Sequence, residues 1–283
     1  MRRVRDTAFL MSMCEACLDI GRDDMHGIAG IFRKFASGRS NHSHTYNVMI
    51  DYPHGSENVH IVVAAGSGSR YGGNLPKQFC DLRGRPMLMT TLERLSASAP
   101  EARIIVVLSP AMENMWCEMC AEHHFTLPHT IIYGGATRAH SVKNAVDTLD
   151  PDIVGWVSVH DAARPMVTAS MFARLLSALD GTHRGAIPAV PVTDSLRELT
   201  PGGGSRAVDR SRYRAVQTPQ LFDGRTLIEA YRREILPTFT DDASVMEAAG
   251  YGPLALVDGD PANIKVTNPG DIDIVSRSLM ENI

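Results

Sequence analysis

The sequence predicts an α/β fold in which a mostly parallel, twisted sheet is flanked by helices. From residue 59 onward, short apolar runs rich in β-branched residues alternate with segments of helical periodicity, as a doubly wound sheet requires. The first run, residues 59–63, is largely apolar, which is typical of a strand buried on both faces. It leads directly into a loop with four glycines between residues 66 and 73, which is typical of a ligand-binding turn.

Each element is predicted from its local pattern. Strands are predicted where a short apolar run is bounded by turn residues, at residues 59–63, 104–108, 131–133, 153–160, 185–192 (interrupted by prolines) and 254–258. Helices are predicted where the composition or the spacing of apolar residues is helical, at residues 87–97, 111–123, 141–149, 168–179, 226–233, 242–249 and 272–279.

Two segments depart from this alternation. In residues 193–216, short β-like pieces flank a Pro-Gly-Gly-Gly turn at 201–204, which predicts a β-arm that projects from the domain. Residues 1–58 have no clear period and end in a linker containing proline, glycine and serine. We expect an N-terminal extension over 1–58, or upstream sequence before a later start at Met49, followed by one domain over 59–283.

Composition excludes several classes of protein. Of the 283 residues, 44% are hydrophobic and 21% charged, which is ordinary for a globular protein, and no apolar run is long enough to span a bilayer. A net charge of -4 gives no general attraction to nucleic acid or to an anionic membrane. Five cysteines do not make a disulfide framework in a chain this long, so we expect a reducing, cytoplasmic location. The pairs Cys14/Cys17 and Cys117/Cys120 fit reduced thiols better than a zinc site.

The loop after the first strand is predicted to bind phosphate. Gly66 and Gly68 let the backbone approach a ligand, so that successive N–H groups converge on an anion, and Arg70 and Lys77 add positive charge. The loop matches neither the Walker A pattern nor the complete G-x-G-x-x-G fingerprint. By pattern alone it therefore also fits a glycine-rich packing turn.

Polar residues follow other strands as well. Ligands of open α/β sheets bind beyond the carboxyl ends of the strands, so we expect the glycine loop, Gly135 with Arg138 and Ser141, and the segment from Asp161 to Arg164 to line one crevice. Asp161 is the candidate Mg²⁺ ligand, because carboxylate oxygens suit Mg²⁺ that is held together with phosphates. A helix cap or an ion pair with Arg164 is the alternative.

Three further candidates lie later in the chain. Lys265 has apolar neighbours, which fits a cation held on a rigid strand, although lysines are usually surface residues. Arg210 lies in the predicted arm, and Thr240 precedes Asp241 and Asp242. Each of these alone also fits surface pairing or helix capping.

Together these segments resemble the 2-C-methyl-D-erythritol 4-phosphate cytidylyltransferases. The resemblance is carried by A-A-G-S-G-S-R (64–70), P-K-Q (76–78), G-G-A-T-R-A-H-S-V (134–142), V-H-D-A-A-R-P (159–165), V-D-R (208–210), Q-T-P-Q (217–220), T-D-D-A-S (240–244) and N-I-K-V-T (263–267). The order and spacing match from residue 59 nearly to the C-terminus, and residues 1–58 fall outside the match.

The resemblance implies a Rossmann-like nucleotidyltransferase fold and transfer of CMP from CTP to the sugar-alcohol phosphate in non-mevalonate isoprenoid biosynthesis. It implies catalytic cations at Arg70, Lys77 and Lys265, and Mg²⁺ at Asp161. The residues expected to bind CTP, which include the two arginines of the crevice, are Ala64, Ala65, Gly66, Gly68, Gly135, Ala136, Arg138, Ser141 and Arg164. The acceptor residues implied are Ser195, Arg210 and Thr240, with the arm supplied by the other subunit of a homodimer.

Three positions differ from the family pattern. Ala136 replaces a frequent acidic residue, Ser195 replaces the usual threonine, and Asp242 stands where glutamate is common. One alternative is a cytidylyltransferase acting on ribitol 5-phosphate or a related pentitol phosphate, whose loop typically reads A-G-G where this chain has A-A-G. A more remote alternative is a non-catalytic nucleotide-binding protein, which would not need to keep Lys77 and Lys265.

Overall fold

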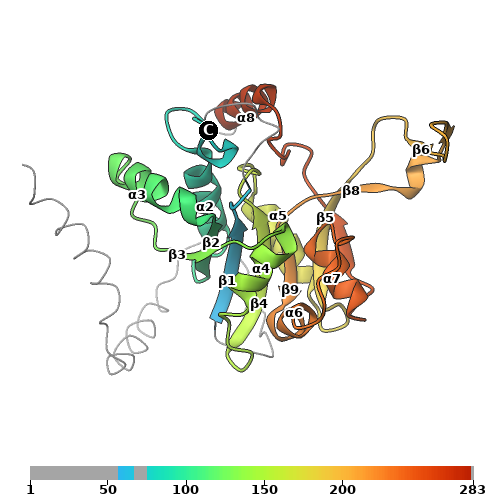
Figure 1. The fold of residues 1–283 in the computed structure, drawn as a ribbon, viewed down its shortest axis with the longest axis horizontal. Coiled ribbons are helices and arrows are strands. Elements are labelled where there is room, and N and C mark those ends of the chain that lie inside the picture. The colour runs from blue at the N-terminus through green and yellow to red at the C-terminus, as the bar shows by residue number, and fades with distance from the viewer. Residues whose placement is uncertain (1–56, 67–74, 282–283) are drawn as a thin grey trace, which may run out of the picture. The chain divides into compact units, whose positions relative to one another are not determined.

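The structure is a computed structural model that describes residues 57–66 and 75–281. The predictions for residues 1–56, and those for Gly68 and Arg70, lie outside the described residues. An eight-stranded sheet is the centre of the described part of the chain (Figure 1). Its strands are β10 (Ala255–Asp258), β5 (Gly185–Pro191), β9 (Gln220–Asp223), β4 (Val154–Asp161), β1 (Glu57–Val63), β2 (Arg103–Leu108) and β3 (Thr130–Tyr133) in that order, with β8 (Arg214–Val216) paired to β5.

The pairing confirms the predicted mostly parallel sheet. β1 pairs in parallel with β2 and β4, β2 pairs in parallel with β3, and β10 pairs in parallel with β5. β9 runs antiparallel between β4 and β5. The sequence analysis did not predict β9, because its apolar run is reduced to two residues, Leu221 and Phe222, both fully buried.

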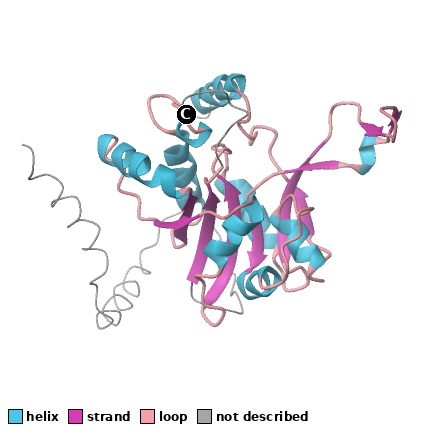
Figure 2. Cartoon of the chain, in the orientation of Figure 1, coloured by secondary structure: helices cyan, strands magenta, loops and turns pink. Residues whose placement is uncertain are grey.

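Helices cover both faces of the sheet (Figure 2). One core cluster joins the sheet to α4 (Arg138–Val146), α6 (Gly224–Tyr231) and α7 (Asp242–Ala248), and others join it to α2 (Met87–Ser98), α3 (Glu113–Glu122) and α5 (Ala169–Ala178). Along β1, Ile61 packs in the first cluster and Val62 in one of the others. Successive side chains of a strand point to opposite faces, so the apolar run buries both faces of β1.

Two predicted helices begin three residues earlier in the structure than the sequence analysis predicts, at 138 instead of 141 and at 269 instead of 272. α4 begins at Arg138, earlier than predicted, because the Thr137 side chain accepts a hydrogen bond from the His140 amide at 3.3 Å. α8 (Pro269–Glu281) also begins earlier and packs through Val275 against a cluster that includes Met166 and Val266. α8 is thereby packed against the segment that contains Lys265.

The predicted arm is present as a hairpin. β6 (Arg197–Leu199) and β7 (Ser205–Ala207) pair antiparallel and stand apart from the main sheet (Figure 1). Residues 214–216, which the sequence analysis assigned to the arm, instead join the sheet as β8. The role of the arm in dimerisation stays a prediction.

Residues 57–66 and 75–281 show neither a membrane-spanning helix nor a metal-binding cluster. None of the helices there has the length and apolar character needed to cross a membrane. No cluster of three or more histidine, cysteine or acidic residues there could hold a metal ion. Cys117 and Cys120 lie on α3, and Cys14 and Cys17 are outside the described ranges.

Candidate active site

A cavity of about 500 Å³ lies at the carboxyl ends of β1 and β4. Its described lining comprises Val63, Ala64, Ala65, Gly66, Lys77, Gln78, Gly135, Ala136, Thr137, Arg138, Ser141, Asp161, Ala162, Ala163 and Lys265. The structure therefore brings together most of the residues that the sequence analysis assigned to CTP, Mg²⁺ and catalysis. Arg164 is outside this lining, although it contacts Asp161.

The first wall of the cavity depends on a close approach between β1 and the start of α4. A Cβ added at Gly134 would lie 2.5 Å from the Cβ of Ala65, and one at Gly135 would lie 2.7 Å from the Cβ of His140. Ser141 Oγ accepts from the Gly135 amide at 3.0 Å and donates to the Thr137 carbonyl at 2.9 Å. The paired glycines are thus required by packing, and they place the N-terminus of α4, which favours anions, beside the cavity.

Another part of the lining comes from the segment that follows the glycine loop, with Lys77 and Gln78. Gln78 is buried, and its Nε2 donates to the carbonyl of Ala64 at 2.6 Å and to that of Gly66 at 3.2 Å. Lys77 Nζ donates to the Val266 carbonyl at 3.2 Å. The bonds of Gln78 hold the segment after the glycine loop against the residues that follow β1. The bond of Lys77 holds the same segment against the one that contains Lys265.

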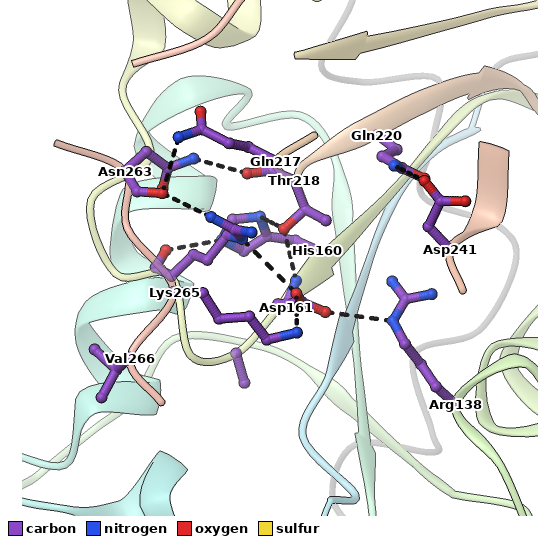
Figure 3. A network of polar contacts seen from close by, with 12 residues as sticks. Arg138, His160, Asp161, Gln217, Thr218, Gln220, Asp241, Asn263, Lys265 and Val266 are labelled. Carbon is purple, nitrogen blue, oxygen red and sulfur yellow. Dashed lines mark hydrogen bonds and ion pairs between the residues drawn. The ribbon is translucent and has the colours of Figure 1, made fainter. Parts of the chain in front are cut away.

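Asp161 lies at the centre of a cluster of cations (Figure 3). Lys265 Nζ is 2.7 Å from its Oδ2, Arg138 Nε is 3.3 Å from its Oδ1, and Arg164 Nε is 3.7 Å from Oδ2. Burial by itself would raise the pKa of Asp161, but Arg138, Lys265 and Arg164 outweigh burial and hold that pKa well below its usual range. Asp161 is therefore ionised at neutral pH.

Arg138 connects this cluster to the protein interior. Its Nη2 lies 2.8 Å from Oδ2 of Asp242, which is fully buried and also accepts from the Tyr231 hydroxyl at 2.5 Å. Burial favours the neutral form of Arg138, and the two carboxylates more than offset this effect, so its pKa is raised. The aspartate at 242 thus reaches Arg138 although its side chain is shorter than the glutamate common in the resembling family.

Comparisons with known proteins identify the family. The family model described as 2-C-methyl-D-erythritol 4-phosphate cytidylyltransferase matches residues 59–281. The chain belongs to this family. Relatives named as this cytidylyltransferase are 44% identical over 219 residues in Bacteroides thetaiotaomicron and 43% identical over 220 residues in Bacteroides fragilis. Each alignment covers 77% of this chain and 98% of the relative.

Solved structures agree with this assignment. The 2-C-methyl-D-erythritol 4-phosphate cytidylyltransferase of Thermus thermophilus is 32% identical, with a TM-score of 0.61 over 80% of this chain and 100% of that one. The 4-diphosphocytidyl-2C-methyl-D-erythritol synthase of Anaerococcus prevotii is 25% identical, with a TM-score of 0.65 over 79% of this chain and 98% of that one. The resemblance and the fold class predicted from the sequence are confirmed.

Beside the cavity of this cytidylyltransferase-family chain lies a buried polar network that the sequence analysis missed. It contains His160, Thr218 and Asn263, which occur in motif blocks that carried the resemblance (Figure 3). Burial lowers the pKa of His160 to about 4, so its imidazole is neutral at pH 7. The available signal was their place in the sequence: His160 directly precedes Asp161, Asn263 precedes Lys265 by two residues, and Thr218 lies in Q-T-P-Q.

The predicted acceptor residues lie away from the first cavity. Ser195 and Arg210 line a separate cavity of about 470 Å³ on the arm, and an Arg210 guanidinium nitrogen donates to the Thr193 carbonyl. Thr240 is exposed, directly before Asp241, the N-cap residue of α7. The structure thus brings Ser195 and Arg210 together, and Thr240 does not join them in the described lining of that cavity.

Proposed function

We propose that the chain transfers CMP from CTP to 2-C-methyl-D-erythritol 4-phosphate, which yields 4-diphosphocytidyl-2-C-methyl-D-erythritol and pyrophosphate. Family membership over residues 59–281 supports this activity. The single structural observation that carries it is the cavity at the carboxyl ends of β1 and β4, whose described lining includes the cations Lys77, Lys265 and Arg138. Positive charge concentrated in a cavity favours the binding of a polyanionic nucleotide.

In the proposed reaction, an oxygen of the acceptor phosphate attacks the α-phosphorus of CTP. A new phosphorus–oxygen bond forms, and the bond from the α-phosphorus to the oxygen of pyrophosphate breaks. The acceptor phosphate is already anionic near neutral pH, so no strong base is needed. The principal barrier is repulsion between two polyanions, and Lys77 and Lys265 would neutralise that repulsion and the charge that develops during transfer.

We also propose that the enzyme uses Mg²⁺. Among the described residues that line the cavity, Asp161 alone carries a carboxylate, and its depressed pKa keeps that carboxylate ionised. One or two carboxylates together with substrate phosphates are a common Mg²⁺ environment, so the donor set fits. Mg²⁺ held by Asp161 would supply further neutralisation of phosphate charge.

Recognition of the nucleoside would use the wall formed by β1 and α4. Ala64, Ala65, Gly135 and Ser141 would shape the pocket for cytosine and ribose. Ala136 has no polar side chain, so recognition of the base there would rest on backbone N–H and C=O groups. We further propose a cytoplasmic homodimer in which the arm, with Ser195 and Arg210, contacts the acceptor bound by the other subunit. Thr240, which lies outside the arm, is the third residue that we propose for the acceptor site.

The first test is pyrophosphate release by the purified full chain with CTP and Mg²⁺. Methylerythritol phosphate and ribitol 5-phosphate are supplied in parallel reactions, and ATP or UTP replaces CTP as a control. We expect turnover with CTP and methylerythritol phosphate. Faster pyrophosphate release with ribitol 5-phosphate would show that a pentitol phosphate is the acceptor. If neither acceptor gives pyrophosphate release, the proposed transfer activity is wrong.

A further inference from the structure

We propose that Thr218 is a positioning residue for cytidylyl transfer. Its hydroxyl, oriented by His160, holds the backbone of Asp161, and its carbonyl holds the segment of Lys265 through Asn263. This inference deepens the proposed function and rests on it. Thr218, His160 and Asn263 are outside the described lining of the cavity, and each is at least 95% buried. They therefore act on the reaction through the residues that they hold.

The Thr218 hydroxyl is bonded to the backbone that carries Asp161. The Asp161 amide donates to Thr218 Oγ1 at 3.0 Å, and the same oxygen lies 3.0 Å from His160 Nδ1 (Figure 3). His160 Nε2 lies 2.9 Å from the Arg164 carbonyl, which can only accept a hydrogen bond. Nε2 of His160 therefore donates to this carbonyl, and Nδ1 is placed to accept the hydroxyl proton of Thr218, whose oxygen already accepts from the Asp161 amide.

The Thr218 carbonyl is bonded to the segment that carries Lys265. Asn263 Nδ2 donates to this carbonyl at 2.8 Å (Figure 3). The carbonyl of Asn263 in turn accepts from Arg164 Nη1 at 2.8 Å, and Asn263 precedes Lys265 by two residues. One residue therefore connects two segments, far apart in the sequence, that carry opposite charges 2.7 Å apart.

Threonine differs from valine mainly in the hydroxyl, which makes the role of that group testable. In Thr218→Val, the Asp161 amide and His160 Nδ1 would be buried without a partner, which is unfavourable. We expect the backbone at Asp161 to move in response, and a displacement of about 1 Å can lower turnover by about 100-fold. Thr218→Ser keeps the hydroxyl and is the conservative rescue.

The experiment compares Thr218→Val, Thr218→Ser and Thr226→Val. Thr226 is also buried, and its hydroxyl donates to the Asp223 carbonyl at the start of α6, away from the cavity. We expect Thr218→Val to lower kcat about 100-fold with a change in KM for CTP below about threefold, because positioning acts on the transfer step. We expect Thr218→Ser to regain most of this loss and Thr226→Val to match the wild type.

Crystal structures of the same variants give a readout that does not depend on activity. We expect the contact between Lys265 Nζ and Asp161 Oδ2 to be lost in Thr218→Val and retained in Thr218→Ser. If the valine variant retains this contact, or retains wild-type kcat, the positioning role is wrong. If the wild type releases no pyrophosphate, the proposed function fails, and the structures still decide whether Thr218 holds the two residues together.

A second variant covers the case in which Thr218→Val does not fold. Asn263→Leu has a side chain of similar size but lacks the amide that donates to the Thr218 carbonyl. We expect a lower kcat with little change in KM for CTP, and loss of the contact between Lys265 and Asp161. Wild-type turnover in folded Asn263→Leu would overturn the connection through Thr218.

Discussion

Arg138 Nη2 and Asp242 Oδ2 lie 2.8 Å apart and form an ion pair between the first residues of two helices, α4 and α7. The Asp242 side chain is fully buried, whereas 26% of the Arg138 side chain is exposed. The same arginine contacts Asp161, so the pair connects the interior to the cavity. Removal of the buried carboxylate would leave both Arg138 and the Tyr231 hydroxyl without this partner.

We therefore expect Asp242→Asn to lower the free energy of unfolding by about 3 kcal/mol, as for other buried ion pairs with one partner removed. Urea denaturation measures this change. The matched control is Asp147→Asn at the C-cap of α4, because Asp147 is exposed and its side chain pairs only with Lys143 in the described contacts. For this exposed pair we expect a change below about 0.5 kcal/mol. If both variants lose the same free energy of unfolding, the buried ion pair stabilises the fold no more than the exposed one does.

The two cavity lysines should contribute to turnover and little to stability. We expect Lys77→Ala and Lys265→Ala each to lower kcat by about 100- to 1,000-fold, the usual effect of removing one group that stabilises transition-state charge. The assay is pyrophosphate release, with circular dichroism to confirm folding. Lys143→Ala is the control, since Lys143 is on α4 but outside the described lining of the cavity. Near-normal turnover in either cavity variant would remove that lysine from the mechanism.

The sequence predicted the parts of the site that follow from strand ends. Asp161 and Lys77 could be assigned to one cavity, because parallel strands bring their carboxyl ends to one edge. The strand β9 and the partners of Thr218 could not be predicted, because a four-residue antiparallel strand has little periodic signal and long-range hydrogen bonds leave none. Likewise, the reach of Asp242 to Arg138 depends on how α4 and α7 pack.

A buried histidine in β1 should make stability depend on pH. His60 is fully buried, and its Nδ1 lies 2.6 Å from Ser158 Oγ. Burial, with a smaller contribution from nearby His160, lowers the pKa of His60 to about 3. The folded protein thus binds fewer protons than the unfolded chain, in which a histidine has a pKa of about 6.5. Stability from this difference is complete above that value and is lost as the pH falls toward the folded pKa.

We expect His60→Gln to remove this contribution. Between about pH 6 and pH 4, the dependence of the unfolding free energy on pH should become shallower by about 1.4 kcal/mol per pH unit. Denaturant titrations at several pH values measure this slope. His160, with a pKa lowered to about 4, contributes a slope of the same sign, so part of the dependence remains. Parallel curves for the variant and the wild type would contradict the prediction.

The arm offers a prediction that separates binding of the acceptor from binding of CTP. Arg210 lines the arm cavity with Ser195, whereas Arg206 on β7 pairs with Glu198 on β6 at 2.6 Å and is outside that cavity's described lining. Both arginines are exposed and lie in the same hairpin region. They therefore form a matched pair in which only Arg210 lines the cavity that we propose receives the acceptor phosphate.

We expect Arg210→Ala to raise KM for methylerythritol phosphate by about tenfold or more, the usual effect of losing one charged hydrogen bond to a ligand, with KM for CTP unchanged. Arg206→Ala should leave both constants near wild type. Initial rates of pyrophosphate release, with each substrate varied in turn, measure the two KM values. If both substrates lose affinity equally, the arginine stabilises the fold or the dimer as a whole. A selective loss for the acceptor would instead assign the arm cavity to the sugar-alcohol phosphate, because only the acceptor would depend on a charge that lies outside the cavity proposed for CTP.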